Sequence, residues 1–132
     1  MTVPGPALSP IDVVLAQLEG LRDEARAGRG AGPGIRRAWE FASPANRVAT
    51  GPVERFADMV RSTVYGVLLE HRAAQLGPLL EHEGEAQQEV LVITAQDDTV
   101  AFTWVLSLQE DPPYAGCWMT DGVLRHPDRR VA

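Results

Sequence analysis

The chain has 132 residues, of which 45% are hydrophobic and 23% charged, the composition of a single soluble globular domain. Its formal net charge of −6 disfavours binding to nucleic acid or to an anionic membrane surface. The single cysteine cannot form an internal disulfide, no apolar run approaches the roughly 18 residues of a transmembrane helix, and the first residues do not resemble a signal peptide. We therefore expect a cytoplasmic protein.

Residues 1–8 contain two prolines and no periodic pattern, so we expect a disordered tail. A strong helix signal follows over residues 9–26, where Ser9 suits the N-cap and Pro10 the first helical position. Apolar residues recur there at steps of three and four, which predicts one buried stripe. The stripe comprises Ile11, Val14, Leu15, Leu18, Leu21 and Ala25.

Four glycines and a proline interrupt the helical pattern at residues 27–34, which predicts a mobile loop inside one domain. Because no strand precedes these glycines, they do not form a phosphate-binding motif. Residues 35–42 predict a second, shorter helix, and residues 43–51 an irregular turn. A third helix is expected to open at Pro52.

The second half of the chain has the sequence pattern of β-strands. A crossing segment after Ser62 leads into a first strand near residues 73–80, and the clean alternation over residues 100–109 predicts a half-buried strand. Two further strands are expected at residues 86–95 and 115–124, followed by a polar tail at residues 125–132. Helices followed by antiparallel strands predict one α+β domain over residues 9–124, with three helices covering the hollow face of a curved sheet of about four strands.

Short motifs add a family likeness that spans most of residues 10–124. Their order resembles the nuclear transport factor 2-like superfamily of cone-shaped α+β rolls, and within it a small bacterial family of undefined function. The motifs are Trp39 with Phe41, Ala42, Ser43 and Pro44, then Gly51, Phe56, Met59 and Val60, and finally Gly116 with Cys117.

The resemblance implies several functions, because the superfamily includes SnoaL-like polyketide cyclases, ketosteroid-isomerase-like enzymes, limonene-epoxide-hydrolase-like enzymes and non-catalytic dimer modules. The convex side of the sheet commonly mediates dimers in this superfamily, so the likeness also implies a homodimer. The alternation of the strands predicts that its interface contains Trp118 with Thr103, Val105 and Thr120.

Asp121 is the sharpest catalytic candidate, because it shares a strand face with Met119 and Val123. If that face is the concave one, burial raises the pKa of this carboxyl, as a general base requires. The alternative is an outward-facing side chain, or one that bonds the backbone at the strand end. His71 is either a hydrogen-bond donor in the same pocket or a surface histidine near the start of a strand.

A pocket at the open end of the roll would need apolar walls with a few polar groups. Cys117 is expected to be a small buried hydrophobe, and the histidine spacing disfavours a metal site. No motif implies a cofactor. The residues expected to line the pocket are Trp39, Tyr65, Phe102, Trp104 and Met119.

Two functions therefore stay open. The first is a non-catalytic ligand-binding or dimerisation module with a small apolar pocket. The second is a small-molecule enzyme, a cyclase or isomerase, with Asp121 as the base and His71 or Tyr65 as the donor. The orientation of Asp121 relative to a cavity distinguishes them.

Overall fold

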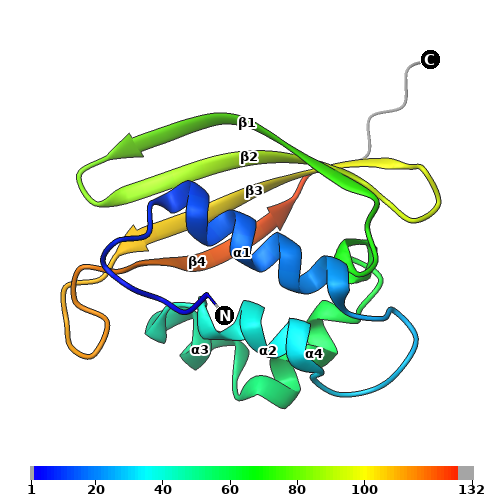
Figure 1. The fold of residues 1–132 in the computed structure, drawn as a ribbon, viewed down its shortest axis with the longest axis horizontal. Coiled ribbons are helices and arrows are strands. Elements are labelled where there is room, and N and C mark those ends of the chain that lie inside the picture. The colour runs from blue at the N-terminus through cyan, green and yellow to red at the C-terminus, as the bar shows by residue number, and fades with distance from the viewer. Residues whose placement is uncertain (1, 128–132) are drawn as a thin grey trace.

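The computed structural model describes residues 2–127, which form five helical segments and four β-strands. The helical segments are α1 (Pro10–Asp23), α2 (Pro33–Glu40), α3 (Pro44–Thr50), α4 (Val53–Val60) and the 3-10 helix η1 (Gly66–Leu68). The strands are β1 (Ala73–His82), β2 (Glu85–Ile93), β3 (Thr99–Leu108) and β4 (Trp118–Arg125). All neighbouring strands pair antiparallel in the order β1-β2-β3-β4, so the predicted α+β class is confirmed (Figure 1).

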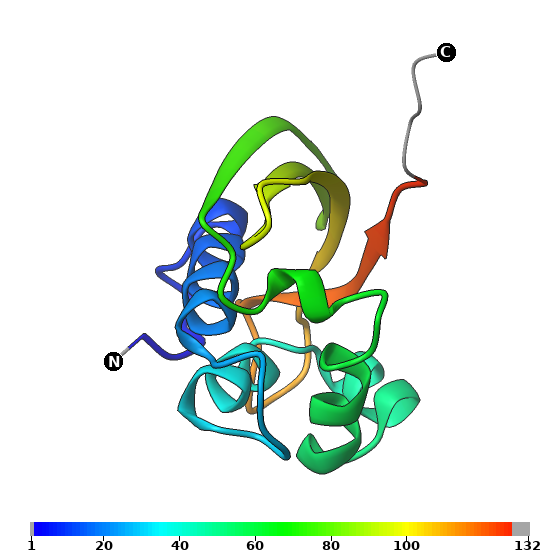
Figure 2. The same cartoon turned by 90° about the vertical axis from the view of Figure 1, so that its right-hand side faces the viewer.

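The sheet is curved and α1 lies along its hollow side (Figure 2). α1 packs against β2, β4 and α2, α3 packs against β4, and α4 packs against α2 and α3. The first helix therefore lines the hollow directly, while α2 and α4 form a further layer beyond it (Figure 1). None of the helices between residues 2 and 127 is long and apolar enough to cross a membrane.

The start of α1 matches its prediction. Ser9 is the N-cap, its hydroxyl accepts from the backbone N–H of Asp12, and the Asp12 carboxylate accepts from the N–H of Ser9. This reciprocal pair satisfies two amide groups that a helix start leaves without partners. Pro10 occupies the first turn, where its missing N–H costs nothing.

The buried face of α1 includes Val14, Leu18 and Leu21 of the predicted stripe but is rotated away from its other members. Ile11 and Leu15 are 37% and 47% exposed, whereas Val13 and Gln17 are buried. The helix has apolar residues on more than one side, so periodicity alone did not select the buried face. The consequence is that a polar residue, Gln17, lies in the core.

Two contacts fix α2 against α1. A Cβ on Gly34 would lie 2.1 Å from the carbonyl oxygen of Gly20, so the two helices meet backbone to backbone. The Glu24 carboxylate accepts from the N–H of Ile35 at 2.9 Å and pairs with Arg61 at 3.5 Å. A carboxylate at this position stabilises the amino-terminal end of α2.

The glycine-rich stretch 27–34, predicted to be mobile, is anchored by α4. The guanidinium of Arg61, the C-cap residue of that helix, donates to backbone carbonyls just before the stretch and within it. The carbonyls belong to Ala25, Arg26 and Gly30, at 2.9, 3.0 and 3.1 Å.

The irregular turn predicted at residues 43–51 is wrong, because most of it forms α3. Ser43 is an N-cap whose hydroxyl accepts from the N–H of Asn46 at 3.1 Å, and Pro44 follows in the first turn. The segment just before α3 also pairs with β4, since Ser43 N–H donates to Thr120 O and Thr120 N–H donates to Phe41 O, both at 2.8 Å. This bridge covers part of an edge that would otherwise be open.

Two β-bulges shape the sheet. In β1 the register shifts between Leu76 and Leu79, and the buried Gln88 of β2 donates to the carbonyl of Gly77 there. In the β3–β4 pair, Val105 lies opposite Gly122 and Leu106 opposite Thr120. Asp121 is therefore the extra, unpaired residue of the second bulge.

The ends of the described region are only partly what the sequence predicts. Leu8, within the expected disordered tail 1–8, packs against the core. Arg125 is the last residue of β4, and the N–H of His126 donates to Ala101 O at 2.9 Å. The remainder of the expected tail 125–132, from residue 128 onward, lies outside the described residues, as does Met1.

Candidate functional site: an apolar cavity with a polar end

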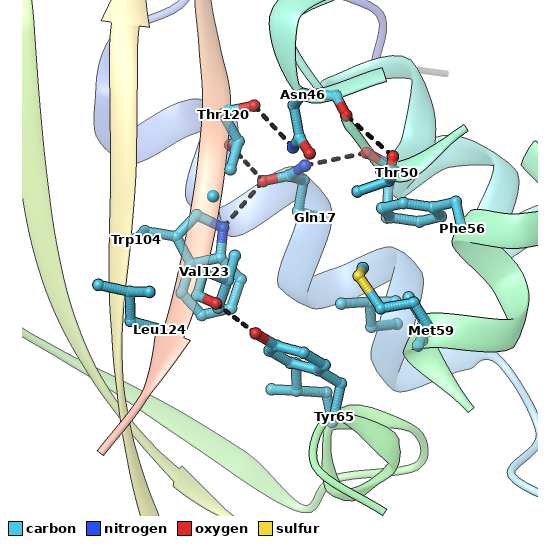
Figure 3. Close-up of a pocket in the computed structure, with 15 residues that line it drawn as sticks. Gln17, Asn46, Thr50, Phe56, Met59, Tyr65, Trp104, Thr120, Val123 and Leu124 are labelled. Atoms are coloured by element: carbon cyan, nitrogen blue, oxygen red, sulfur yellow. Dashed lines mark hydrogen bonds between the residues drawn. The ribbon is translucent and has the colours of Figure 1, made fainter. Parts of the chain in front are cut away.

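A cavity of about 280 Å³ lies between the helices and the inner face of β3 and β4 (Figure 3). Its wall is mostly apolar, with the side chains of Phe56 and Met59 on one side and Trp104 on the other. The remaining lining residues are Gln17, Leu21, Ala38, Asn46, Thr50, Val60, Tyr65, Leu68, Thr120, Gly122, Val123 and Leu124. This size and composition are typical of small-molecule sites.

Gln17 organises the polar end of the cavity. The side chain is 4% exposed, and its Nε2 donates to Ala38 O at 2.9 Å. Its Oε1 accepts from Trp104 Nε1 at 2.9 Å and from Thr120 Oγ1 at 2.6 Å. One amide thus satisfies a helix carbonyl, an indole and a hydroxyl, which would each be costly to bury without a partner.

Asn46 and Thr50 extend this polar end from α3. Asn46 Nδ2 donates to Thr120 O at 3.0 Å, and Thr50 Oγ1 donates to the backbone oxygen of Asn46 at 3.0 Å. Tyr65 closes the other end, where its hydroxyl donates to Val123 O at 2.7 Å (Figure 3). These bonds hold the polar side chains in fixed positions around an apolar space.

The part of the cavity wall that residues 2–127 form carries no charged side chain. Tyr65 is the one titratable side chain among the described lining residues. The cation of Arg47, on the adjacent helix α3, is used elsewhere: it lies 4.2 Å from the ring centre of Trp39 and donates to the Tyr114 hydroxyl and Glu40 O. The cavity is therefore an environment for neutral groups.

Asp121 does not line the cavity, although its neighbours Thr120 and Gly122 do. Its side chain is exposed, because the bulge turns it away from the hollow. Regular alternation along the strand would place Asp121 on one face with Met119 and Val123. The bulge breaks that alternation, since Val123 lies opposite the inward Trp104 and Met119 lies opposite Ser107 on the other face.

His71 is buried at 4% exposure, between η1 and β1, and is not among the residues that line the cavity. Its Nδ1 lies 2.6 Å from Leu68 O, so this nitrogen carries the proton. Burial lowers the pKa of the imidazole from its usual 6.5. The bond to Leu68 opposes that shift, Arg22 adds to it, and Asp23 opposes it.

Of the five residues expected to line the pocket, Tyr65 and Trp104 lie in its wall. Phe102 is buried in the main core, edge-on to Trp104 with ring centres 6.1 Å apart. Met119 is also buried, outside both the cavity wall and the main core cluster. Trp39 lies under Arg47 instead of in the wall.

The four residues expected at an interface are dispersed. Thr120 is buried at the polar end of the cavity, and Trp118 packs against the core because it pairs with Leu108 on the inner side of the sheet. Val105 is half-buried. Thr103 is buried, and its hydroxyl lies 2.7 Å from Glu89 Oε1 and 2.6 Å from His126 Nε2.

The polar residues at one end of the cavity were not predicted from the sequence. The available signal for Gln17 is its place three residues after Val14 and four before Leu21, within an apolar stripe. Asn46 and Thr50 had no such signal once residues 43–51 were interpreted as a turn. The capping pattern of Ser43 and Pro44 was the available indication of a helix there.

The fold and site define an α+β domain with a partly open cavity between its helices and its sheet, lined by uncharged described residues. The family described as "Domain of unknown function (DUF4864)" matches residues 11–131, so the chain belongs to that family. The match confirms the predicted membership of a family of unknown function. No curated protein and no solved structure gives a significant match.

Replacement of Gln17 by methionine tests the polar end. Gln17→Met keeps the length of the side chain but leaves Trp104 Nε1, Thr120 Oγ1 and Ala38 O without this partner, so we expect a loss of about 2–4 kcal/mol in the free energy of unfolding. Denaturant unfolding measures it. Gln75→Met, at an exposed position of β1, is the matched control and should change stability by less than about 0.5 kcal/mol. Equal stabilities of the two variants would contradict the network.

His71 predicts a pH dependence of stability. Because its pKa is lowered in the folded state, the unfolded chain takes up the proton first as pH falls below about 6.5. The free energy of unfolding should therefore decline below that pH, by at most about 1.4 kcal/mol per pH unit from this residue. His71→Gln should flatten the decline, measured by urea unfolding between pH 7.5 and 5. His82→Gln, which changes an exposed histidine, should leave it in place.

Proposed function

We propose that this protein is a binding module that holds a small, largely apolar molecule in the cavity of about 280 Å³, without acid–base chemistry. The observation that carries the proposal is the composition of the wall, which is apolar except for hydroxyl and amide groups gathered mainly at one end. Such a wall stabilises an apolar ligand by desolvation and orients it by a few hydrogen bonds. An apolar cavity of about 150 Å³ in another protein suffices for benzene, so a one- or two-ring molecule fits the space here.

The alternative, a cyclase or isomerase of the SnoaL or ketosteroid-isomerase kind, requires an acid or base that reaches the ligand. The exposed position of Asp121 and the buried position of His71 outside the cavity favour binding over catalysis. Tyr65 alone would have to supply both roles, and its proton is already donated to Val123 O. We further propose that the domain is a roll of the nuclear transport factor 2-like kind, on the order and pairing of its elements.

A bulky side chain in the cavity wall tests the proposal. Met59→Trp places an indole where a partly buried methionine lines the cavity, so we expect at least about tenfold weaker binding of a neutral, two-ring, environment-sensitive dye, 6-propionyl-2-(dimethylamino)naphthalene. Dye titration followed by fluorescence measures the affinity.

The control is Val48→Trp, at a position of α3 that is 87% exposed and outside the wall. It adds the same indole and should leave dye affinity within about twofold of the unmodified protein. Asp121→Asn should have equally little effect, because that side chain lies outside the cavity. Equal affinities of Met59→Trp and Val48→Trp would contradict the proposed site.

A second candidate role is homodimerisation through the outer face of the sheet. Leu91 of β2 is 43% exposed there, and its partner Ala101 and the nearby Val105 of β3 are only half-buried. Exposed apolar residues gathered on one sheet face are typical of contact surfaces. We propose that a second copy of this chain covers this face.

A charge on that face tests the dimer. Leu91→Arg introduces an unpaired cation into the proposed contact, so we expect it to shift the protein from dimer to monomer at micromolar concentration. Sedimentation velocity or native mass spectrometry measures the change. Val48→Arg is the matched control on the helical side and should stay dimeric. If the unmodified protein is a monomer in solution, the proposed homodimer is wrong.

A further inference from the structure

The hydroxyl hydrogens in the cavity wall are already donated to oxygens of the protein, and this restricts the ligands that the cavity can bind. Thr50, Tyr65 and Thr120 are the three hydroxyl residues of the wall. Each donates its hydroxyl hydrogen to an oxygen that can only accept: the backbone oxygens of Asn46 and Val123, and the side-chain oxygen of Gln17. A hydroxyl has one hydrogen, so none of the three has another to offer a ligand.

The amide orientations are fixed by the same reasoning. Gln17 Oε1 faces the indole N–H of Trp104, which can only donate, and its Nε2 faces a carbonyl, which can only accept. Asn46 Nδ2 faces the carbonyl of Thr120, so Asn46 Oδ1 must be the oxygen on the other side of that amide. Neither amide can be reversed without placing like groups against each other.

Acceptors therefore outnumber donors in the wall. The half-buried hydroxyl oxygens of Thr50 and Tyr65 each retain lone pairs, and Asn46 Oδ1 accepts no hydrogen bond within the described residues, whereas Thr120 is only 1% exposed. Among the described side chains of the wall, the second amide hydrogen of Asn46 is the donor that stands against these three oxygens, because Gln17 is only 4% exposed. A ligand gains most if it brings a hydrogen to donate.

The uncharged lining also disfavours ligands that carry a net charge. Among residues 2–127, no cation lines the cavity to pair with an anionic ligand, and no carboxylate lines it to pair with an ammonium group. Burying either ion without a partner costs several kcal/mol. The acceptor oxygens would in addition repel a carboxylate.

We infer that the cavity selects neutral apolar molecules that carry a hydrogen-bond donor, such as an alcohol, a phenol or an indole N–H, over carbonyl compounds, ethers and carboxylates of the same shape. This inference rests on the proposed binding function, because it names the ligand class of the same cavity. It goes beyond that function by ranking ligands of equal size and hydrophobic surface.

Matched ligand pairs test the ranking. Indole and benzofuran have nearly the same shape, but only indole has an N–H; 1-phenylethanol and acetophenone differ as alcohol and ketone. We expect the donor of each pair to bind about five- to tenfold more tightly, measured by displacement of the same neutral two-ring dye and confirmed by calorimetry. Phenylacetate, the anionic probe, should bind at least about tenfold more weakly than 1-phenylethanol.

The outcomes separate the inference from the function that it rests on. Equal affinities within both pairs, with binding abolished by Met59→Trp, would overturn the donor preference and leave the binding function intact. Tighter binding of acetophenone or phenylacetate would overturn the preference as well. If no probe binds up to its solubility, both the binding function and the preference fail.

Variants of the wall hydroxyls test which acceptor oxygens cause the preference for ligands that donate a hydrogen bond. Thr50→Val keeps the shape of the side chain but removes one acceptor oxygen, so we expect a smaller ratio between 1-phenylethanol and acetophenone while their hydrophobic binding persists. Tyr65→Phe removes the acceptor at the other end, and a reduction confined to one of the two variants identifies the end that holds the ligand. An unchanged ratio in both variants, and in the double variant, would overturn the role of these hydroxyl oxygens.

Discussion

The amide of Gln17 connects four elements that are distant in the sequence. From α1 it reaches the last turns of α2 through Ala38 O, β3 through the Trp104 indole and β4 through the Thr120 hydroxyl. In a low-dielectric interior each of these groups would be costly without a partner, so the position of α1 in the hollow of the sheet is fixed to within hydrogen-bond tolerance. Apolar contacts alone would allow the helix to slide or rotate; the amide specifies one arrangement.

The bulge at Asp121 is the second constraint. A regular strand would place Met119 and Val123 on one face, whereas the extra residue puts them on opposite faces and turns the carboxylate to solvent. The same shift leaves Thr120 directed at Gln17 and Gly122 at the cavity. The polar end of the cavity therefore depends on a local irregularity of β4, and the residue that causes it is not itself part of the wall.

These two constraints explain how much the sequence could predict. The cap of α1, the four strands and the burial of Trp104 follow from local chemistry and period-two alternation, and the structure bears them out. The rotation of α1, the helix α3 and the faces of β4 do not follow, because they depend on contacts between residues up to about a hundred positions apart, such as Thr120 with Gln17. Hydrophobic periodicity predicts the secondary structure that a segment prefers. The position of a bulge or of a buried amide depends instead on contacts with residues that are close in space.

The same hydrogen bonds explain why the cavity stays open in the folded protein. An unfilled space of this size costs stability, since the atoms that line it lose contacts they would make in a filled core. Collapse would require Phe56 or Met59 to approach Trp104, but Trp104 is held by Gln17. The bonds from Ser43 N–H and Asn46 Nδ2 to Thr120 O hold α3 beside β4. The polar network thus keeps apart the walls that the hydrophobic effect would bring together. A ligand that fills the space recovers the lost contacts, and a donor on that ligand meets oxygens whose own hydrogens are already engaged with the protein.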